Sequence, residues 1–133
     1  MNPAVTQYAP LIGRILIAQI FLASGFGKIM GFTQTAAAIA GKGLPMAEVL
    51  VVLSIVIEIG AGLMILLGWK ARIGAILLFL WMIPVSWAFH NYWTMTGMEA
   101  YINKIMFQKN LAMMGAMLYI LAFGSGPYSV KKD

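Results

Sequence analysis

Two charged side chains stand inside long apolar stretches of this sequence, and they are the first candidates for chemistry. Arg14 lies in the stretch 10–29, and Glu58 lies near the middle of the stretch 46–67. Ionised groups at membrane depth are costly unless they are paired or hydrated. Glu58 precedes the end of its stretch by about ten residues, or ~15 Å of helical rise, a depth that an extended arginine can largely bridge. We therefore predict a contact between Arg14 and Glu58, direct or through water.

Two hypotheses describe what such a pair would do. In the first, Arg14 and Glu58 form a buried ion pair that only fixes the register of two helices. In the second, Glu58 is a carboxylate that handles a proton, with Arg14 balancing its charge. The sequence leaves both open.

A second group of polar residues lies toward the opposite ends of the same stretches. Ser24 precedes Lys28 by one helical turn, so both lie on one side of their helix. A histidine near lysines and aromatic rings could bind the oxygen atoms of a quinone-like ring or exchange a proton. The alternative is a histidine at the membrane interface beside lysines that extend toward water. The candidate binding residues are Ser24, Lys28, His90, Trp93, Lys109 and Asn110.

The elements that must position these residues are membrane-spanning helices. Hydrophobic residues make up 62% of the 133 residues and charged residues only 10%, whereas about 25% of a soluble domain is charged. A span needs about 20 mostly apolar residues, and the sequence contains four such runs. We predict an all-α, polytopic four-transmembrane-helix bundle in a single domain, 1–133, with a short interfacial helix at 98–106. The expected spans are 10–29, 46–67, 73–90 and 107–123.

The composition also limits the chemistry that this chain can carry alone. There is no cysteine, so neither a thiolate nucleophile nor an iron–sulfur cluster is expected. One histidine and four scattered carboxylates do not form the usual ligand clusters of zinc or di-iron sites, so no metal is expected. Redox chemistry would need a quinone or another cofactor that diffuses or is held by a partner.

The basic residues predict an orientation rather than a nucleic-acid partner, because the lysines are scattered at the ends of spans. Lys70, Arg72, Lys131 and Lys132 lie on one side of the bundle, outside the spans. Lys28, Lys42, Lys104 and Lys109 lie toward the other side. The short Lys70–Arg72 turn favours both termini on the cytoplasmic side.

Several segments in a fixed order resemble the DoxX family of small bacterial membrane proteins. Span one carries Gly13-Arg14-Ile15-Leu16 and Phe21 to Lys28; span two carries Glu58 to Leu63 and ends in Leu66 to Arg72. His90-Asn91-Tyr92-Trp93, Gln108 to Ala112 and Gly124 to Ser129 follow. The family pattern usually reads His-x-Phe-Trp, so Tyr92 adds a hydroxyl near His90. The resemblance implies a four-helix bundle in the bacterial inner membrane and a polar set of Arg14, Lys28, Glu58, His90, Lys109 and Asn110.

The resemblance also implies a link to redox systems. Proteins similar to DoxX are associated with thiosulfate:quinone oxidoreductase or quinol oxidase subunits, with thiol and oxidative-stress defence, and with quinone and catechol resistance. The first hypothesis is therefore a membrane protein that binds a quinone-type ligand, with Glu58, Arg14 and His90 at the reacting centre, and works with a redox partner or as a homo-oligomer. The second is a non-catalytic accessory subunit. A small transporter is the third, and four spans would need an oligomer to form a channel.

Overall fold

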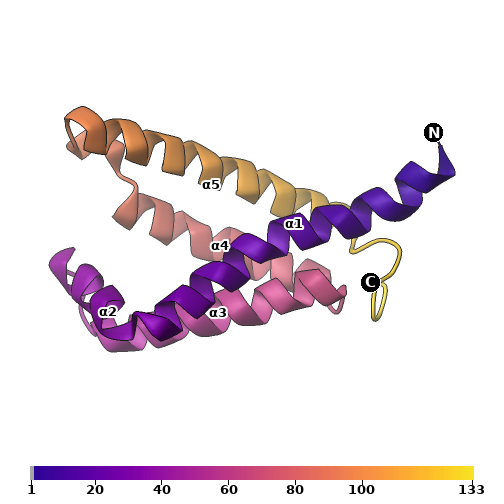
Figure 1. Cartoon of the computed structure of the whole chain (residues 1–133), viewed down its shortest axis with the longest axis horizontal. Coiled ribbons are helices and arrows are strands. Elements are labelled where there is room, and N and C mark those ends of the chain that lie inside the picture. Colours follow the sequence, from indigo (N-terminus) through magenta and orange to yellow (C-terminus); the bar gives the residue numbers. More distant parts are fainter. Residues whose placement is uncertain (1) are drawn as a thin grey trace.

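Four long helices build this protein, and each is long and apolar enough to cross a membrane. The computed structural model describes residues 2–133 (Figure 1). The prediction of an all-α bundle with four spans is confirmed. The elements are α1 (Pro3–Met30), α2 (Phe32–Gly41), α3 (Ala47–Leu67), α4 (Ala71–Phe89), the short 3-10 helix η1 (Tyr92–Thr94) and α5 (Gly97–Phe123).

Two helices begin earlier than the sequence predicts. The first helix starts at Pro3 rather than Pro10, because the side chain of Asn2 accepts the backbone N–H of Ala4 and caps the helix. Proline suits that first position, where no backbone donor is needed. The last helix, α5, is continuous from Gly97, so the separate interfacial helix expected at 98–106 is part of it. Lysine and glutamine are good helix formers, so a change to polar composition does not end a helix.

Small residues bring α1 and α3 close together. A Cβ added to Gly25 of α1 would collide with the side chain of Ile59 of α3. A Cβ added to Gly62 of α3 would lie 3.2 Å from a methyl group of Leu22. Membrane helices associate through such close packing because lipid provides no hydrophobic driving force between them. The register of α1 on α3 therefore depends on these two glycines.

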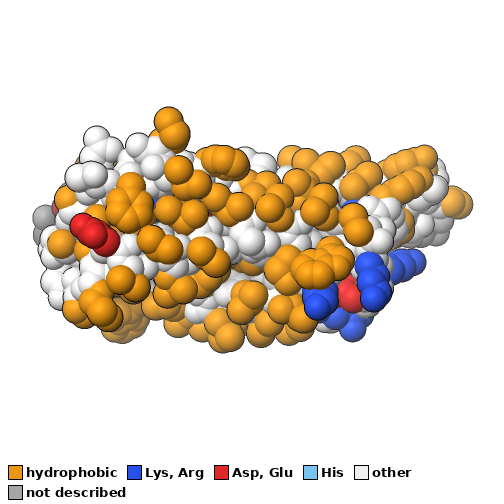
Figure 2. All heavy atoms as spheres, turned by 90° about the horizontal axis from the view of Figure 1, so that it is seen from below, with side chains coloured by type: hydrophobic (Ala, Val, Ile, Leu, Met, Phe, Trp, Pro, Cys, Tyr) orange, Lys and Arg blue, Asp and Glu red, His pale blue; other side chains and the backbone are white. Residues whose placement is uncertain are grey.

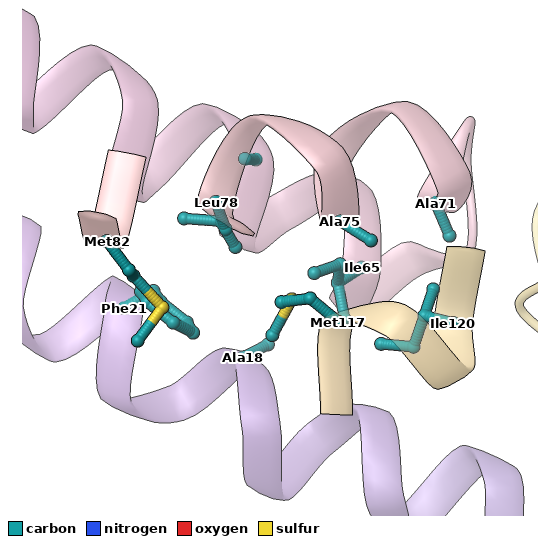
Figure 3. Close-up of a cluster of buried hydrophobic side chains, with 10 residues drawn as sticks. Ala18, Phe21, Ile65, Ala71, Ala75, Leu78, Met82, Met117 and Ile120 are labelled. Carbon is teal, nitrogen blue, oxygen red and sulfur yellow. The ribbon is translucent and has the colours of Figure 1, made fainter. Parts of the chain in front are cut away.

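The buried core lies toward one end of the bundle. Side chains from four helices meet there, among them Ala18 of α1, Ile65 of α3, Leu78 of α4 and Met117 of α5, all with no exposed surface (Figure 3). At the other end, α4 and α5 diverge from α1 and α3 (Figure 1), and a cavity lies between them. We call these the packed end and the open end.

The C-terminal segment, residues 124–133, closes the packed end. It runs along the turn between α3 and α4, where the backbone N–H groups of Val130 and Lys131 donate to the carbonyls of Leu67 and Gly68, at 2.8 and 3.1 Å. An isolated β-bridge joins Trp69 to Lys131. We call this segment the clasp. It ties the end of α5 to the α3–α4 turn.

Arg14 holds the clasp from inside the bundle. Its guanidinium donates to the carbonyls of Pro127 and Tyr128 at 3.2 and 3.1 Å and to Ser129 Oγ at 3.0 Å. The side chain is only 3% exposed, so these uncharged oxygens replace water as its hydrogen-bond acceptors.

The predicted contact between Arg14 and Glu58 is wrong. The Arg14 guanidinium lies beside Gly68 at the end of α3, since a Cβ added to Gly68 would collide with the arginine Nη1. Glu58 lies ten residues earlier in α3, or ~15 Å of helical rise. The two terminal nitrogens of the guanidinium bind the nearby clasp instead of extending across that depth, and Nε has no hydrogen-bond partner within residues 2–133.

We expect Gly68→Ala to lower the free energy of unfolding by more than about 2 kcal/mol. Gly68 has a φ of +69°, which alanine rarely adopts, and its Cβ would also lie 2.6 Å from Ser129 Oγ. The matched control is Gly60→Ala in α3, where no atom lies within 4 Å of the added Cβ; it should stabilise by about 0.5–1 kcal/mol. Thermal unfolding in detergent, with protease sensitivity of the clasp, measures both. Equal effects at the two positions would contradict this account of the clasp.

Candidate functional site

The open end contains a cavity of about 720 Å³ enclosed by α1, α2, α3, α4 and α5. Its walls are mainly apolar, with aromatic surfaces from Phe21, Trp81 and Phe89. The polar side chains that line it come from α1, α2, α3 and α5 and from the residue after α4; they are Ser24, Lys28, Gln34, Thr35, Ser54, Glu58, His90 and Asn110. An apolar chamber with a few convergent polar groups is the usual form of a small-molecule site.

An ion pair between Lys28 and Glu58 forms one wall of the cavity. Lys28 Nζ lies 2.7 Å from Glu58 Oε2 and 2.8 Å from Oε1, and it also donates to Ser24 Oγ at 2.9 Å. The Ser24 hydroxyl in turn donates to Glu58 Oε1 at 3.2 Å. Side chains on a helix lean toward its N-terminus, so Lys28 reaches back into the bundle. It does not extend outward to water, which was the alternative for this lysine.

Glu58 is buried, Lys28 is partly exposed, and the pair is nearly saturated with hydrogen bonds. Glu58 is 7% exposed, and the lysine ammonium uses all three of its donors on Ser24 and the carboxylate. Each ion compensates the desolvation of the other, so removing one leaves an unpaired buried charge. Glu58 Oε2 accepts only from Lys28 among residues 2–133. That oxygen can still accept a hydrogen bond from a molecule in the cavity.

His90 lies at the rim of the cavity, and its hydrogen bonds fix which ring nitrogen carries the proton. Asn103 donates its side-chain N–H to the carbonyl of Glu99 at 2.9 Å, which turns its Oδ1 toward His90 Nδ1, also at 2.9 Å. Because Oδ1 can only accept, Nδ1 must donate. In the neutral ring, Nε2 is then an acceptor, and no hydrogen bond to it occurs within residues 2–133.

Two further polar groups meet the cavity from α4 and α5. Asn110 lines the cavity and donates to the hydroxyl of Ser86, which is 4% exposed, at 2.9 Å. Trp81 Nε1 is buried and has no hydrogen-bond partner in the part of the chain that the structure describes. Such a buried donor without a partner is rare and indicates a place for an acceptor. No cluster of three or more His, Asp or Glu side chains occurs within residues 2–133.

The structure brings together most of the binding residues chosen from the sequence. Ser24, Lys28, Glu58, His90 and Asn110 all line the one cavity, although they come from different parts of the chain.

Three of the chosen residues do not line the cavity. Arg14 lies at the packed end, and Lys109 is exposed on α5. Trp93, 48% exposed, packs against Trp87 with ring centroids 5.1 Å apart.

Sequence reasoning missed Trp81, Ser86 and Asn103. Ser86 could have been found, because it precedes His90 by four residues, which is one helical turn. Asn103 has no such signal, since it reaches His90 only through the turn at η1.

Comparison with known proteins agrees with this architecture. The sequence pattern of the DoxX family matches residues 9–91. Inner membrane protein YphA of Escherichia coli (strain K12) is 35% identical over 122 residues, which cover 92% of this chain and 87% of that protein. Inner membrane protein YqjF of the same organism is 31% identical over 122 residues, covering 92% and 88%. No solved structure matches the chain. With the family pattern covering more than half of its length, this integral membrane protein belongs to the DoxX family.

Proposed function

We propose that this protein binds a quinone-type ligand in the open-end cavity, as the membrane component of a redox-associated system. One observation carries the proposal. Five of the polar residues expected to bind a ligand, namely Ser24, Lys28, Glu58, His90 and Asn110, line a single apolar chamber. If these residues served only helix packing, their side chains would be expected to contact neighbouring helices rather than to line a cavity.

The size of the cavity supports a ring with an apolar tail. Pockets for small molecules have volumes of about 300–1,000 Å³, and this one has about 720 Å³. Phe21 and Trp81 offer aromatic surfaces on which a planar ring can stack. An apolar tail can lie along the apolar walls of the cavity toward the open end.

The open hydrogen-bonding groups suit both redox forms of such a ring. Trp81 Nε1 can donate to a carbonyl oxygen of the oxidised form. His90 Nε2 and Glu58 Oε2 can accept from a hydroxyl of the reduced form. Oxidation of a quinol to a quinone releases two protons and two electrons. In this proposal His90 Nε2 accepts one hydroxyl proton, the second proton is released to water at the open end, and both electrons pass to a redox centre of a partner protein.

Ligand binding should quench the fluorescence of Trp81. We expect a variant that keeps Trp81 and replaces Trp69, Trp87 and Trp93 with phenylalanine to be quenched saturably by a short-tailed benzoquinone in detergent. His90→Phe should weaken binding of the reduced form by about 5- to 12-fold, because it loses a hydrogen bond of about 1–1.5 kcal/mol. Fluorescence titration measures quinone binding, and calorimetric titration with the corresponding quinol measures binding of the reduced form.

Lys109→Gln provides the control, since Lys109 is exposed and lies outside the cavity; its affinity should equal that of the parent. An organic extract of the purified protein should also contain quinone. A linear, non-saturating quench together with a quinone-free extract would remove the ligand proposal.

A specific observation favours a second candidate, a non-catalytic accessory subunit. The Lys28 ammonium and the Ser24 hydroxyl already provide most of the hydrogen bonds that the Glu58 carboxylate accepts. In this second candidate the ion pair joins α1 to α3 and has no other role. A buried ion pair is often replaceable by apolar residues without loss of stability. Stability and ligand binding can therefore be separated by mutation.

We expect Lys28→Met alone to destabilise the protein by about 3–5 kcal/mol, because it leaves Glu58 buried without a counter-ion. The double variant Lys28→Met with Glu58→Leu should recover most of that loss. Thermal unfolding in detergent measures the stability of each variant. If the double variant folds and still binds the quinone with parental affinity, the pair is structural, and its proposed part in the ligand site is wrong.

We also propose that the packed end, with both termini, faces the cytoplasm of the bacterial inner membrane. Lys70, Lys131 and Lys132 lie outside the helices at that end, and Arg72 is in the first turn of α4. At the open end, Lys28 is engaged inside the bundle, and only Lys42 lies outside a helix. The excess of basic loop residues at the packed end favours the cytoplasmic side.

The orientation predicts the behaviour of fusions to the C-terminus. A green fluorescent protein joined after Asp133 should fluoresce, and an alkaline phosphatase joined there should be inactive. Fusions in the loop after Gly41, at the open end, should give the reverse result. An active C-terminal phosphatase would place the clasp outside the cytoplasm.

A further inference from the structure

A second hollow lies at the packed end, on the side where α1 and α5 face the bilayer. It is a groove of about 420 Å³ between residues of α1, from Pro10 to Ile17, and residues from Ala116 to Ser125 at the end of α5. Its walls include the exposed rings of Tyr119 and Phe123. The groove is separate from the cavity at the open end, because the buried core lies between them.

The clasp gathers positive charge at this end. Its bridge to Trp69 places Lys131 beside the turn that carries Lys70 and Arg72, and Lys132 follows. Figure 2 shows the Lys and Arg side chains collected at the end of the molecule near the C-terminus, around one acidic side chain, on an otherwise hydrophobic surface. Four basic residues lie here against one carboxylate, that of Asp133.

The carboxylate of Asp133 binds the backbone of Arg72 and forms no ion pair with its guanidinium. Its Oδ2 accepts the backbone N–H of Arg72 at 3.0 Å, and its Oδ1 accepts the hydroxyl of Ser125. Burial raises the pKa of Asp133, but these hydrogen bonds outweigh that effect and hold the pKa below its usual value. No ion pair of the Arg72 guanidinium occurs within residues 2–133.

Arg72 lies at the rim of the groove. A Cβ added to Gly124, which lines the groove, would lie 3.3 Å from Nε and Nη2 of Arg72. The guanidinium therefore sits over the polar end of the groove, at the level of the turn between α3 and α4. The apolar walls extend from there along Ile17, Ala116 and Tyr119, toward the middle of the bilayer.

We propose that this groove is a binding site for an anionic phospholipid. The phosphate lies at Arg72 beneath the lysines of the clasp, and one acyl chain lies between α1 and α5. Arginine binds phosphate oxygens with two parallel N–H groups, and basic residues at the membrane surface attract anionic headgroups. The site depends on the clasp, because the clasp brings two of the four positive charges to the rim.

Native mass spectrometry of the whole protein, released from detergent with equal amounts of phosphatidylglycerol and phosphatidylcholine, tests the proposal. We expect phosphatidylglycerol to be retained in preference. Arg72→Gln should lower its occupancy about fivefold, which is the effect of one surface charge on lipid binding. The matched control is Lys104→Gln, an exposed lysine at the opposite end of α5, which should change nothing.

A second variant tests the groove without changing the charge. Ala116→Phe should fill the apolar part and lower phosphatidylglycerol retention while all four basic residues remain; circular dichroism should show unchanged helix content. Equal retention of the two lipids by the parent protein would overturn the proposal. So would an Ala116→Phe variant that folds and retains phosphatidylglycerol fully, since the basic patch would then attract headgroups without a site for the chain.

Discussion

The ion pair between Lys28 and Glu58 is the contact on which the open half of this bundle depends. A carboxylate in the middle of a span must be satisfied within the protein, because the surrounding lipid has no donors. Lys28 provides its donors from α1, and it can do so only because Gly25 and Gly62 let α1 lie close to α3. Pairing of the Glu58 charge therefore fixes the register of α1 on α3 and, with it, the shape of the cavity wall.

The other buried charge is satisfied in a different way, and this gives the molecule two unlike ends. Arg14 binds uncharged oxygens of the clasp, so the packed end keeps a positive charge without an acidic partner. The hydrophobic core lies at that same end. Stability is concentrated there, which leaves the open end free to hold a cavity with polar groups that do not contribute to packing.

The sequence predicts the spans well, because the length and hydropathy of a helix that crosses lipid are local properties. It also indicates the proximity of Ser24 and Lys28, which are four residues apart on one helix. It fails for Arg14, whose partners belong to a segment with no helical period. It fails again for Asn103, whose contact with His90 depends on how η1 turns the chain. Contacts between side chains of different helices depend on the depth of each residue in the bundle and on helix register. The composition of the spans predicts neither.

The cavity groups without a hydrogen-bond partner indicate more about a ligand than the charged groups do. Lys28 is fully engaged, so attraction by a free ammonium contributes little to binding. Trp81 Nε1 and His90 Nε2 are directional and uncharged, and they lie about nine residues apart along α4 and its end, or ~13 Å of rise. A carbonyl oxygen of the ligand would be bound by the donor Trp81 Nε1 and a hydroxyl by the acceptor His90 Nε2, so the two redox forms would be held by different groups of one cavity.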